Sequence, residues 1–361
     1  MVSESCNHRC DYCFVHGKKP QGNMPLEVAR QTVRFMFDNC RYWDTVSFLF
    51  FGGEPLLNWP AVMAIVELAE AKAQDRGKKL ELDMTTNGTL FGEEMLAYLR
   101  KHRVKFLLSI DGDKASHDAH RRMQDGASSY ERVVRLLPLT KRYQPWQGTR
   151  MTVHPDQVHR MAANVRHLHG LGINQFVIGP ATGLDWSADH LGIYEDQMYE
   201  ILDFYAARQR ENAPFRMSMF EKNVVGRPGS HKGDWGCGAG RGRVCVGADG
   251  SLYGCGKIHG VDPEGTHSLL GDVWTGYSKP ENRWPLLDAG AGNRLKCQGC
   301  EYADDCCGGC PAASLEATGS FLMPSELDCA LVPMTARIQE RARRILKTPE
   351  QHGRFYREGG P

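Results

Sequence analysis

The sequence predicts an α/β protein in which a partial (β/α)6 TIM-like barrel precedes a smaller, loop-rich and cysteine-rich domain. Helix-like and strand-like segments alternate from residue 25 to about residue 212, which is typical of a parallel sheet covered by helices. Beyond that point the alternation stops, and Gly, Pro and Cys become frequent. We therefore expect a barrel over 1–212, a linker over 213–236, a cysteine-rich domain over 237–335 and a C-terminal helix and tail over 336–361.

The expected strands are short and rich in β-branched, aromatic or leucine side chains. They cover residues 45–51, 79–86, 104–110, 149–155 and 174–180. The first strand is a special case, because only five residues precede Cys6. That strand is expected to be stunted, unless translation starts upstream of Met1.

The expected helices carry apolar residues at helical spacing. In the first of them Leu26, Ala29, Val33 and Phe37 fall on one face. These helices cover residues 25–39, 59–73, 93–102, 130–143, 157–170, 194–210 and 335–347. Pro138 should kink or end the helix that contains it.

Composition excludes several classes of protein. The chain has 361 residues, 41% of them hydrophobic and 24% charged, as in an ordinary globular protein. A net charge of +1 gives no reason to expect a nucleic acid or a membrane surface as partner. Apolar stretches such as residues 46–51 are too short to span a bilayer, and no secretory signal is visible. We expect a cytoplasmic protein.

The thirteen cysteines are clustered. Three lie within residues 6–13, one is Cys40, and the other nine lie from Cys237 to Cys329. In a reducing cytosol, such clusters indicate metal or iron–sulfur ligation more than disulfides. Cys40, at the end of a helix, is expected to be structural.

Residues 6–14, CNHRCDYCF, place Cys6, Cys10 and Cys13 at the spacing C-x3-C-x2-C. The alternative is a cysteine stripe on one face of a helix. The intervening residues nucleate a helix poorly, however, and Gly17 and Pro20 follow at once. Three thiolates that hold a [4Fe–4S] cluster would leave one iron open to an external ligand.

A second motif, GGEP, ends the strand expected at 45–51. Gly52 and Gly53 would let the backbone approach a ligand closely, and Glu54 could accept a hydrogen bond from an ammonium group. A plain turn is the alternative interpretation.

Together, C-x3-C-x2-C and a strand-terminal GGEP about 40 residues later in a βα-repeat chain resemble the radical S-adenosylmethionine (SAM) family. The resemblance implies that the amine and carboxylate of SAM occupy the open iron. It also implies that Tyr12 contacts adenine, that Ser109 contacts the ribose or carboxylate, and that Arg121 pairs with the carboxylate. Arg122 is the competing assignment, and a solvated helix start is the alternative for both arginines. The TTNG segment (85–88) resembles the family's third strand.

In such an enzyme the reduced cluster cleaves SAM, and the 5′-deoxyadenosyl radical removes hydrogen from the substrate. The cofactor performs this chemistry while the protein positions it and excludes water. An external electron donor of the flavodoxin or ferredoxin type is implied.

The C-terminal cysteines form a second pattern, for which a zinc ribbon is the alternative. Behind a radical SAM barrel, seven of them and Gly250 resemble the SPASM extension, which binds two auxiliary [4Fe–4S] clusters. The resemblance assigns Cys297, Cys300, Cys306 and Cys329 to the outer cluster, and Cys237, Cys255 and Cys310 to the inner one.

Two further cysteines have no fixed role. Cys307 could replace its neighbour Cys306 as a ligand. Cys245 is either a small buried hydrophobe or the fourth ligand of the inner cluster. Without a fourth side chain, the inner cluster would have an iron open to a substrate thiolate.

SPASM proteins mostly modify peptides or proteins. We expect a maturase that joins a sulfur or carbon atom of one residue of a ribosomally made peptide to a carbon of another. Anaerobic sulfatase maturases, which make formylglycine, are the alternative, but they carry an Asp where this chain has Gly256. An electron-transfer or zinc-stabilised binding protein without SAM chemistry is the other alternative. Leader recognition is expected from the barrel and SPASM surfaces or from a separate leader-peptide-binding protein.

Overall fold

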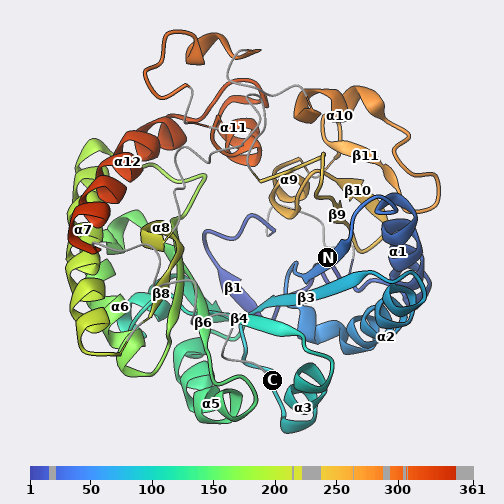
Figure 1. Ribbon diagram of the computed structural model, residues 1–361, viewed down its shortest axis with the longest axis horizontal. Coiled ribbons are helices and arrows are strands. Elements are labelled where there is room, and N and C mark those ends of the chain that lie inside the picture. The colour runs from blue at the N-terminus through green and yellow to red at the C-terminus, as the bar shows by residue number, and fades with distance from the viewer. Residues whose placement is uncertain are drawn as a thin grey trace.

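The centre of the molecule is an open barrel (Figure 1). The computed structural model describes residues 1–15, 22–213, 215–221, 237–262, 264–287, 293–303, 306 and 308–346. Six strands form one parallel sheet in the order β2-β3-β4-β6-β7-β8. Their bounds are β2 (Thr45–Phe50), β3 (Lys79–Thr86), β4 (Lys105–Ser109), β6 (Gly148–Val153), β7 (Gln175–Pro180) and β8 (Arg216–Met217). The prediction of a partial (β/α)6 barrel is confirmed.

Helices cover the outside of this sheet, as Figure 1 shows. They are α1 (Leu26–Asn39), α2 (Trp59–Asp75), α3 (Glu93–Lys101), α4 (Lys114–His120), α5 (Ser129–Tyr143), α6 (Met161–Gly170) and α7 (Ala188–Arg210), with 3-10 turns η1 (Pro55–Asn58) and η2 (Pro155–Arg160). Helix α5 does not end at Pro138 but continues to Tyr143. Its buried face, with Val133, Leu137 and Thr140, extends to both sides of the proline, so packing compensates for the lost backbone hydrogen bond.

Little remains of a first barrel strand. Ser3 forms a single parallel bridge with Gly52, beside the end of β2. The next segment, β1 (His8–Cys10), leaves the main sheet and pairs antiparallel with β5 (Arg121–Met123). The stunted first strand is therefore replaced by a short ribbon that carries the first cysteines.

The sixth strand lies beyond residue 212, where we expected the barrel to end. β8 pairs with Gln175 and Phe176 of β7, and α8 (Ser218–Glu221) follows it. A two-residue strand has no periodicity that could distinguish it from a linker. The sheet thus continues into the stretch expected to be a linker.

The two faces of the sheet differ in chemistry. Phe48, Met84 and Leu108 are buried on the face that packs against the helices. The alternate residues point into the barrel, because successive strand side chains lie on opposite faces. The parallel register places Ser109 of β4 beside Arg150 of β6 on this inner face.

The C-terminal region closes the gap between the two open edges of the barrel (Figure 1). Its described residues form the antiparallel sheet β11-β10-β9 and four short helical segments. Their bounds are β9 (Cys245–Val246), β10 (Ser251–Tyr253), β11 (Leu269–Asp272), α9 (Gly256–Val261), α10 (Pro280–Leu287), η4 (Leu295–Cys297) and α11 (Pro311–Thr318). On one side, Gln31 of α1 donates a hydrogen bond to the carbonyl of Val273 at 3.0 Å.

On the other side, the final helix α12 (Glu326–Leu346) runs along α7, and it crosses the boundary expected at residue 335. Arg337 pairs with Glu195 at 2.6 Å across this contact. Among the helices of the described ranges, no segment is long and apolar enough to cross a membrane.

Candidate active site and cysteine clusters

The first three cysteines lie at the carboxyl end of the barrel strands, on and beside β1. The backbone N–H of His8 donates to Cys6 Sγ at 3.3 Å, and Asn87 Nδ2 lies 3.9 Å from the same sulfur. Arg121 Nη1 lies 3.7 Å from Cys10 Sγ. N–H groups directed at sulfur are the surroundings that tune iron–sulfur ligands.

The three thiols interact electrostatically with one another. Burial raises the pKa of Cys6 to about 11 and that of Cys10 to about 12, and the charge of Cys13 adds to both shifts. The positive charge of Arg121 opposes them. The structure therefore brings the three predicted ligands together, in a form that would bind metal only by losing protons.

The glycines of GGEP lie against the N-terminal segment of the chain. A Cβ on Gly52 would lie 2.3 Å from the carbonyl oxygen of Ser3, and a Cβ on Gly53 would lie 2.2 Å from that of Ser5. Gly53 N–H donates to the Ser3 carbonyl at 2.9 Å. The close approach that requires glycine here is that of the chain's own N-terminal segment, which these contacts fix in front of Cys6.

Glu54 is 1% exposed and accepts three hydrogen bonds. Oε1 accepts from Leu56 N–H at 3.1 Å and from the Thr86 hydroxyl at 2.6 Å, while Oε2 accepts from Asn87 N–H at 2.8 Å. Burial raises the pKa of Glu54 to about 7, against the effect of these donors. A carboxylate has about four acceptor positions, so Oε2 keeps room for one more donor, such as an ammonium group.

The TTNG segment at the end of β3 connects the two motifs. Asn87 Nδ2 donates to Asn7 Oδ1 at 2.8 Å, next to Cys6, while the Asn87 backbone binds Glu54. Asn87 is 5% exposed. Sequence reasoning left its role open, and the structure makes it the link between the cysteine ribbon and Glu54.

Arg121 is engaged within the protein. Its Nε and Nη2 atoms donate to the two oxygens of Asp111 at 3.0 and 3.2 Å. The Tyr12 hydroxyl donates to Asp111 as well, and Arg121 lies 5.4 Å from the centre of the Tyr12 ring. Burial alone would raise the pKa of Asp111, but Arg121 holds it below its usual value. Arg122, the competing assignment, is exposed and donates to the Asp118 carbonyl at 2.7 Å.

A second arginine faces the inside of the barrel, and sequence reasoning missed it. Arg150 lies beside Ser109, and its Nη1 donates to the Val177 carbonyl at 3.2 Å. No carboxylate lies within ion-pair distance of Arg150 in the part of the chain that the structure describes. Burial lowers the pKa of Arg150. Within the described residues, Arg150 donates no hydrogen bond to the Ser109 hydroxyl. The alternation of apolar and polar residues over 149–155 was the signal that could have placed Arg150 on the inner face.

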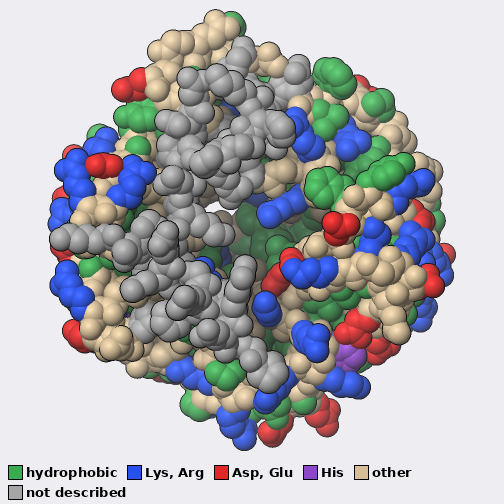
Figure 2. Space-filling model, viewed as in Figure 1, with side chains coloured by type: hydrophobic (Ala, Val, Ile, Leu, Met, Phe, Trp, Pro, Cys, Tyr) green, Lys and Arg blue, Asp and Glu red, His purple; other side chains and the backbone are tan. Residues whose placement is uncertain are grey.

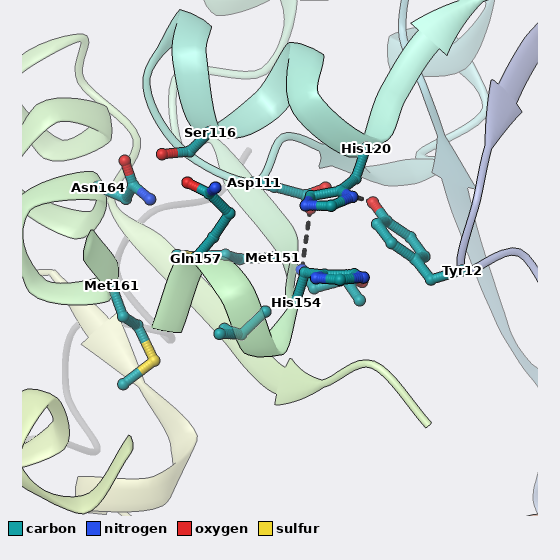
Figure 3. A pocket seen from close by; sticks show the side chains of 11 residues that line it. Tyr12, Asp111, Ser116, His120, Met151, His154, Gln157, Met161 and Asn164 are labelled. Carbon is teal, nitrogen blue, oxygen red and sulfur yellow. Dashed lines mark hydrogen bonds between the residues drawn. The ribbon is translucent and has the colours of Figure 1, made fainter. Parts of the chain in front are cut away.

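A small pocket opens beside Tyr12 (Figure 3). The rings of His120 and His154 stack there, with centroids 3.7 Å apart. His120 Nδ1 contacts Asp11 Oδ2 at 2.7 Å and its Nε2 contacts Asp156 Oδ1 at 2.9 Å. Burial would lower the pKa of His120, but the two carboxylates outweigh it and raise the pKa. Each ring nitrogen contacts a carboxylate, and this arrangement favours the protonated form of His120.

The four cysteines predicted for the outer cluster come together at the far end of the C-terminal region. The charges of Cys300 and Cys306 raise the pKa of Cys297, after the larger effect of burial. The charges of Cys297 and Cys306 also raise the pKa of Cys329. Cys300 and Cys329 are exposed, so this group lies at the surface. Cys307 lies outside the described residues.

The cysteines predicted for the inner cluster come together only in part. Cys255 caps α9; burial raises its pKa to about 12, and the charges of Cys310 and Cys245 add to the shift. Cys237 is exposed. Antiparallel pairing of β9 with β10 places Cys245 opposite Tyr253, two residues before Cys255. The structure thus favours Cys245 as a member of this group. Cys40 packs against the core, as expected.

The first ribbon and helix α9 are in direct contact. The rings of Phe14 and Phe51 stack with centroids 5.9 Å apart. A Cβ on Gly260 would lie 2.5 Å from Phe14, and one on Gly256 would lie 3.2 Å from Phe51. Figure 2 shows that the surface of the molecule is hollowed between the barrel and the C-terminal region. The segment that follows Cys13 and the helix that Cys255 caps therefore pack against each other.

A buried contact between two side chains joins the same two parts. His259 Nε2 of α9 lies 2.7 Å from Glu4 Oε1, and both side chains are at most 3% exposed. Glu4 comes two residues before Cys6, and His259 comes four residues after Cys255. The barrel and the cysteine-rich region are thereby fixed to each other near both cysteine groups.

Comparison with known proteins explains this arrangement. The family model of the radical SAM superfamily matches residues 1–183. The chain belongs to the radical SAM superfamily. It is 24% identical over 336 residues to the serine-type anaerobic sulfatase-maturating enzyme of Klebsiella aerogenes, an alignment that covers 88% of this chain and 80% of that enzyme. It is 29% identical over 155 residues to the radical SAM cyclopropyl synthase TigE of Paramaledivibacter caminithermalis, which covers 39% of this chain and 32% of that one.

Solved structures show the same fold over nearly the whole chain. The structure of anSMEcpe with bound AdoMet has a TM-score of 0.77 at 20% identity and covers 97% of both chains. Streptococcus suis SuiB bound to S-adenosylmethionine has a TM-score of 0.62 at 18% identity and covers 91% of this chain and 75% of that one. Both were also solved with peptides, SuiB with its precursor peptide SuiA. The prediction of a radical SAM enzyme related to sulfatase maturases is confirmed.

Proposed function

We propose that this radical SAM enzyme matures a ribosomally made peptide by forming a thioether or carbon–carbon crosslink. One observation carries the proposal: a second cysteine group, at Cys255 and Cys310, lies beside α9, the helix that packs against Phe14 of the SAM-binding motif, and no carboxylate follows Cys255. Crosslinking removes two electrons from the peptide, and an auxiliary cluster at this place would accept the second one. The peptide complexes of anSMEcpe and SuiB support a peptide as substrate class.

The residues at the barrel mouth suit SAM. Glu54 Oε2 has an acceptor position left for the ammonium group, and Ser109 and Arg150 offer a hydroxyl and a guanidinium group side by side for the carboxylate. Cys6, Cys10 and Cys13 would hold the [4Fe–4S] cluster, and Tyr12 would border adenine. When bound, cluster and SAM supply a 5′-deoxyadenosyl radical that takes hydrogen from the substrate. The protein's own residues orient SAM and keep water away.

The cysteine-rich region would hold two auxiliary [4Fe–4S] clusters. The outer cluster would be bound by Cys297, Cys300, Cys306 and Cys329. The inner cluster would be bound by Cys255, Cys310 and Cys245. The sequence also assigned Cys237 to the inner cluster. An external electron donor of the flavodoxin or ferredoxin type would reduce the first cluster. Recognition of the leader would use the barrel and SPASM surfaces or a separate leader-peptide-binding protein.

Formylglycine formation is the second candidate, because the Klebsiella aerogenes sulfatase-maturating enzyme matches over 88% of the chain. Gly256 opposes it. The place after Cys255 has no side chain, and a Cβ there would already lie 3.2 Å from Phe51. The residue that follows, Lys257, is paired with Glu316 at 2.6 Å. No acid of the expected kind stands at this position.

The test is anaerobic reconstitution followed by reaction with SAM and dithionite. We expect about twelve irons per chain from three clusters, and formation of 5′-deoxyadenosine that a Cys6→Ala variant loses. Co-expression with short cysteine-rich peptides encoded beside the gene should then yield a peptide lighter by about 2 Da, the mass of two hydrogens. A zinc-only protein, or 5′-deoxyadenosine formed equally by Cys6→Ala, would overturn the proposal. Conversion of a Cys or Ser to formylglycine would decide for the second candidate.

A further inference from the structure

Arg294 is an unusual residue, because its side chain is 0% exposed and lies in the cysteine-rich region. It stands at the start of η4, where its carbonyl accepts a hydrogen bond from Cys297 N–H at 2.9 Å. This turn places the guanidinium group close enough to Cys297 for the charges of the two side chains to act on each other. Arginine is among the residues least often buried without a partner charge.

The guanidinium group also reaches the loop that carries Cys306. Arg294 Nη1 donates to the Gly308 carbonyl, and a Cβ on Gly308 would lie 1.9 Å from Nη1. Gly308 has a φ of +84°, so both its backbone and the space beside it require glycine. Its N–H donates to Cys306 Sγ at 3.2 Å. Arg294 thus lies between two of the four cysteines of the outer group.

The acidic groups that surround the guanidinium group of Arg294 are the thiols of Cys297 and Cys306 and the carboxylate of Asp328. One Asp328 oxygen already accepts from Cys310 N–H at 3.1 Å and from the Ser325 hydroxyl at 2.8 Å. A buried cation costs several kcal/mol unless negative charge stands beside it. Four thiolates around iron supply that negative charge.

We propose that Arg294 is the countercharge of the outer auxiliary cluster and raises the reduction potential of that cluster. The inference rests on the proposed function, since it needs an iron–sulfur cluster at Cys297, Cys300, Cys306 and Cys329. A fixed positive charge in a poorly hydrated site favours the reduced state, which carries one more negative charge, and N–H···S hydrogen bonds act in the same direction.

The position of the outer group indicates what a raised reduction potential would do in the enzyme. Cys300 and Cys329 are exposed, whereas Cys255 is partly buried at the start of α9. In the proposed function the substrate would give one hydrogen atom to the 5′-deoxyadenosyl radical, then one electron to the inner cluster and one proton to solvent. A higher potential at the outer cluster would favour transfer of that electron to the surface, where an oxidised flavodoxin- or ferredoxin-type protein would accept it.

The experiment uses the full chain with Cys6, Cys10 and Cys13 replaced by Ala, so that only auxiliary clusters remain. In this background we compare Arg294 with Arg294→Lys and Arg294→Gln by iron content and by potentiometric titration followed by EPR. For Arg294→Gln we expect at least a tenfold lower reduced-to-oxidised ratio for one cluster at fixed potential, a shift of about 59 mV for a one-electron couple. Arg294→Lys, which keeps the charge, should shift less. Lys296→Gln is the control, because the side chain of Lys296 is 33% exposed near the same cysteines and solvent screens its charge.

Each outcome has a separate meaning. Loss of about four irons in Arg294→Gln but not in Arg294→Lys would also support the proposal, since charge would then be needed to assemble the cluster. Full iron with an unchanged potential in Arg294→Gln would overturn it, and so would an equal effect of Lys296→Gln. A parent chain that holds no iron would instead overturn the auxiliary clusters of the proposed function, before any Arg294 variant is measured.

Discussion

Arg121 and Asp111 form a two-pronged ion pair beneath the first cysteine ribbon, with nitrogen–oxygen distances of 3.0 and 3.2 Å. Their side chains are only 10% and 4% exposed. Asp111 Oδ1 also accepts from Thr152 N–H at 2.9 Å, so the pair ties β5 to β6. Resemblance to the family assigned Arg121 to the carboxylate of SAM, but in this structure its main partner belongs to the protein.

Removing one member of this pair should make the barrel easier to unfold. Asp111→Asn would leave the Arg121 charge buried, and we expect a loss of about 3–5 kcal/mol of unfolding free energy, measured by urea denaturation of the apo chain. The control is Asp38→Asn, which breaks the surface pair with Arg76 and should cost about 0–1 kcal/mol. Equal losses of unfolding free energy in the two variants would show that the buried pair contributes no more to stability than the surface pair.

Arg150 should contribute to SAM binding. Arg150→Gln removes the guanidinium group that faces Ser109, and loss of a charge-assisted hydrogen bond of about 1.5–3 kcal/mol corresponds to an affinity about 10–150 times weaker. Anaerobic calorimetry of the cluster-loaded protein measures this. Arg122→Gln is the control, because Arg122 is exposed, and its SAM affinity should not change. An unchanged affinity in Arg150→Gln, with a loss in Arg122→Gln, would reverse the assignment.

Cys245 should be needed for the inner cluster. Its charge acts on Cys255, and a Cβ on Gly256 would lie 3.8 Å from its sulfur. We expect Cys245→Ala to lower the iron content by up to about four per chain, or to make that cluster labile. Cys40→Ala, which removes a thiol from the barrel core, should leave the iron content unchanged. If Cys237→Ala lowers it and Cys245→Ala does not, the assignment made from sequence holds.

The buried histidine His117 should make stability depend on pH. Its Nδ1 accepts from Asp111 N–H at 3.2 Å, so its Nε2–H donates to the Ser129 hydroxyl at 2.8 Å. Burial lowers the pKa of His117 from 6.5 to about 4. The unfolded chain therefore binds more protons between pH 4 and 6.5, and stability is complete above pH 6.5 and falls as the pH decreases.

This histidine alone should account for a loss of about 3 kcal/mol across that window. We expect His117→Asn to have a flatter dependence of unfolding free energy on pH than the native chain, when both are measured as apo protein. His8, whose pKa burial lowers to about 3, remains in the variant and keeps part of the slope. Exposed His159 provides the control, and His159→Asn should leave the slope unchanged.

Periodicity and motif spacing predicted most of the fold, but contacts changed the meaning of several residues. The strands at 45–51 and 79–86 carry patterns strong enough to be recognised, whereas β8 is too short for any pattern. Gly52 and Gly53 were expected to admit a ligand, and the structure shows the Ser3 and Ser5 carbonyls against them. A local motif cannot show which distant segment occupies the space beside a glycine.

The sequence by itself determined the fold class and the grouping of the cysteines, because helical and strand periodicity and ligand spacing are local properties of the chain. Only the tertiary structure decided that Arg121 is engaged by Asp111, that Arg150 faces Ser109 and that Cys245 joins Cys255. These relations depend on strand register and on which side chains are buried away from water. Buried charges must find partners wherever the fold brings them, and that choice is made in three dimensions.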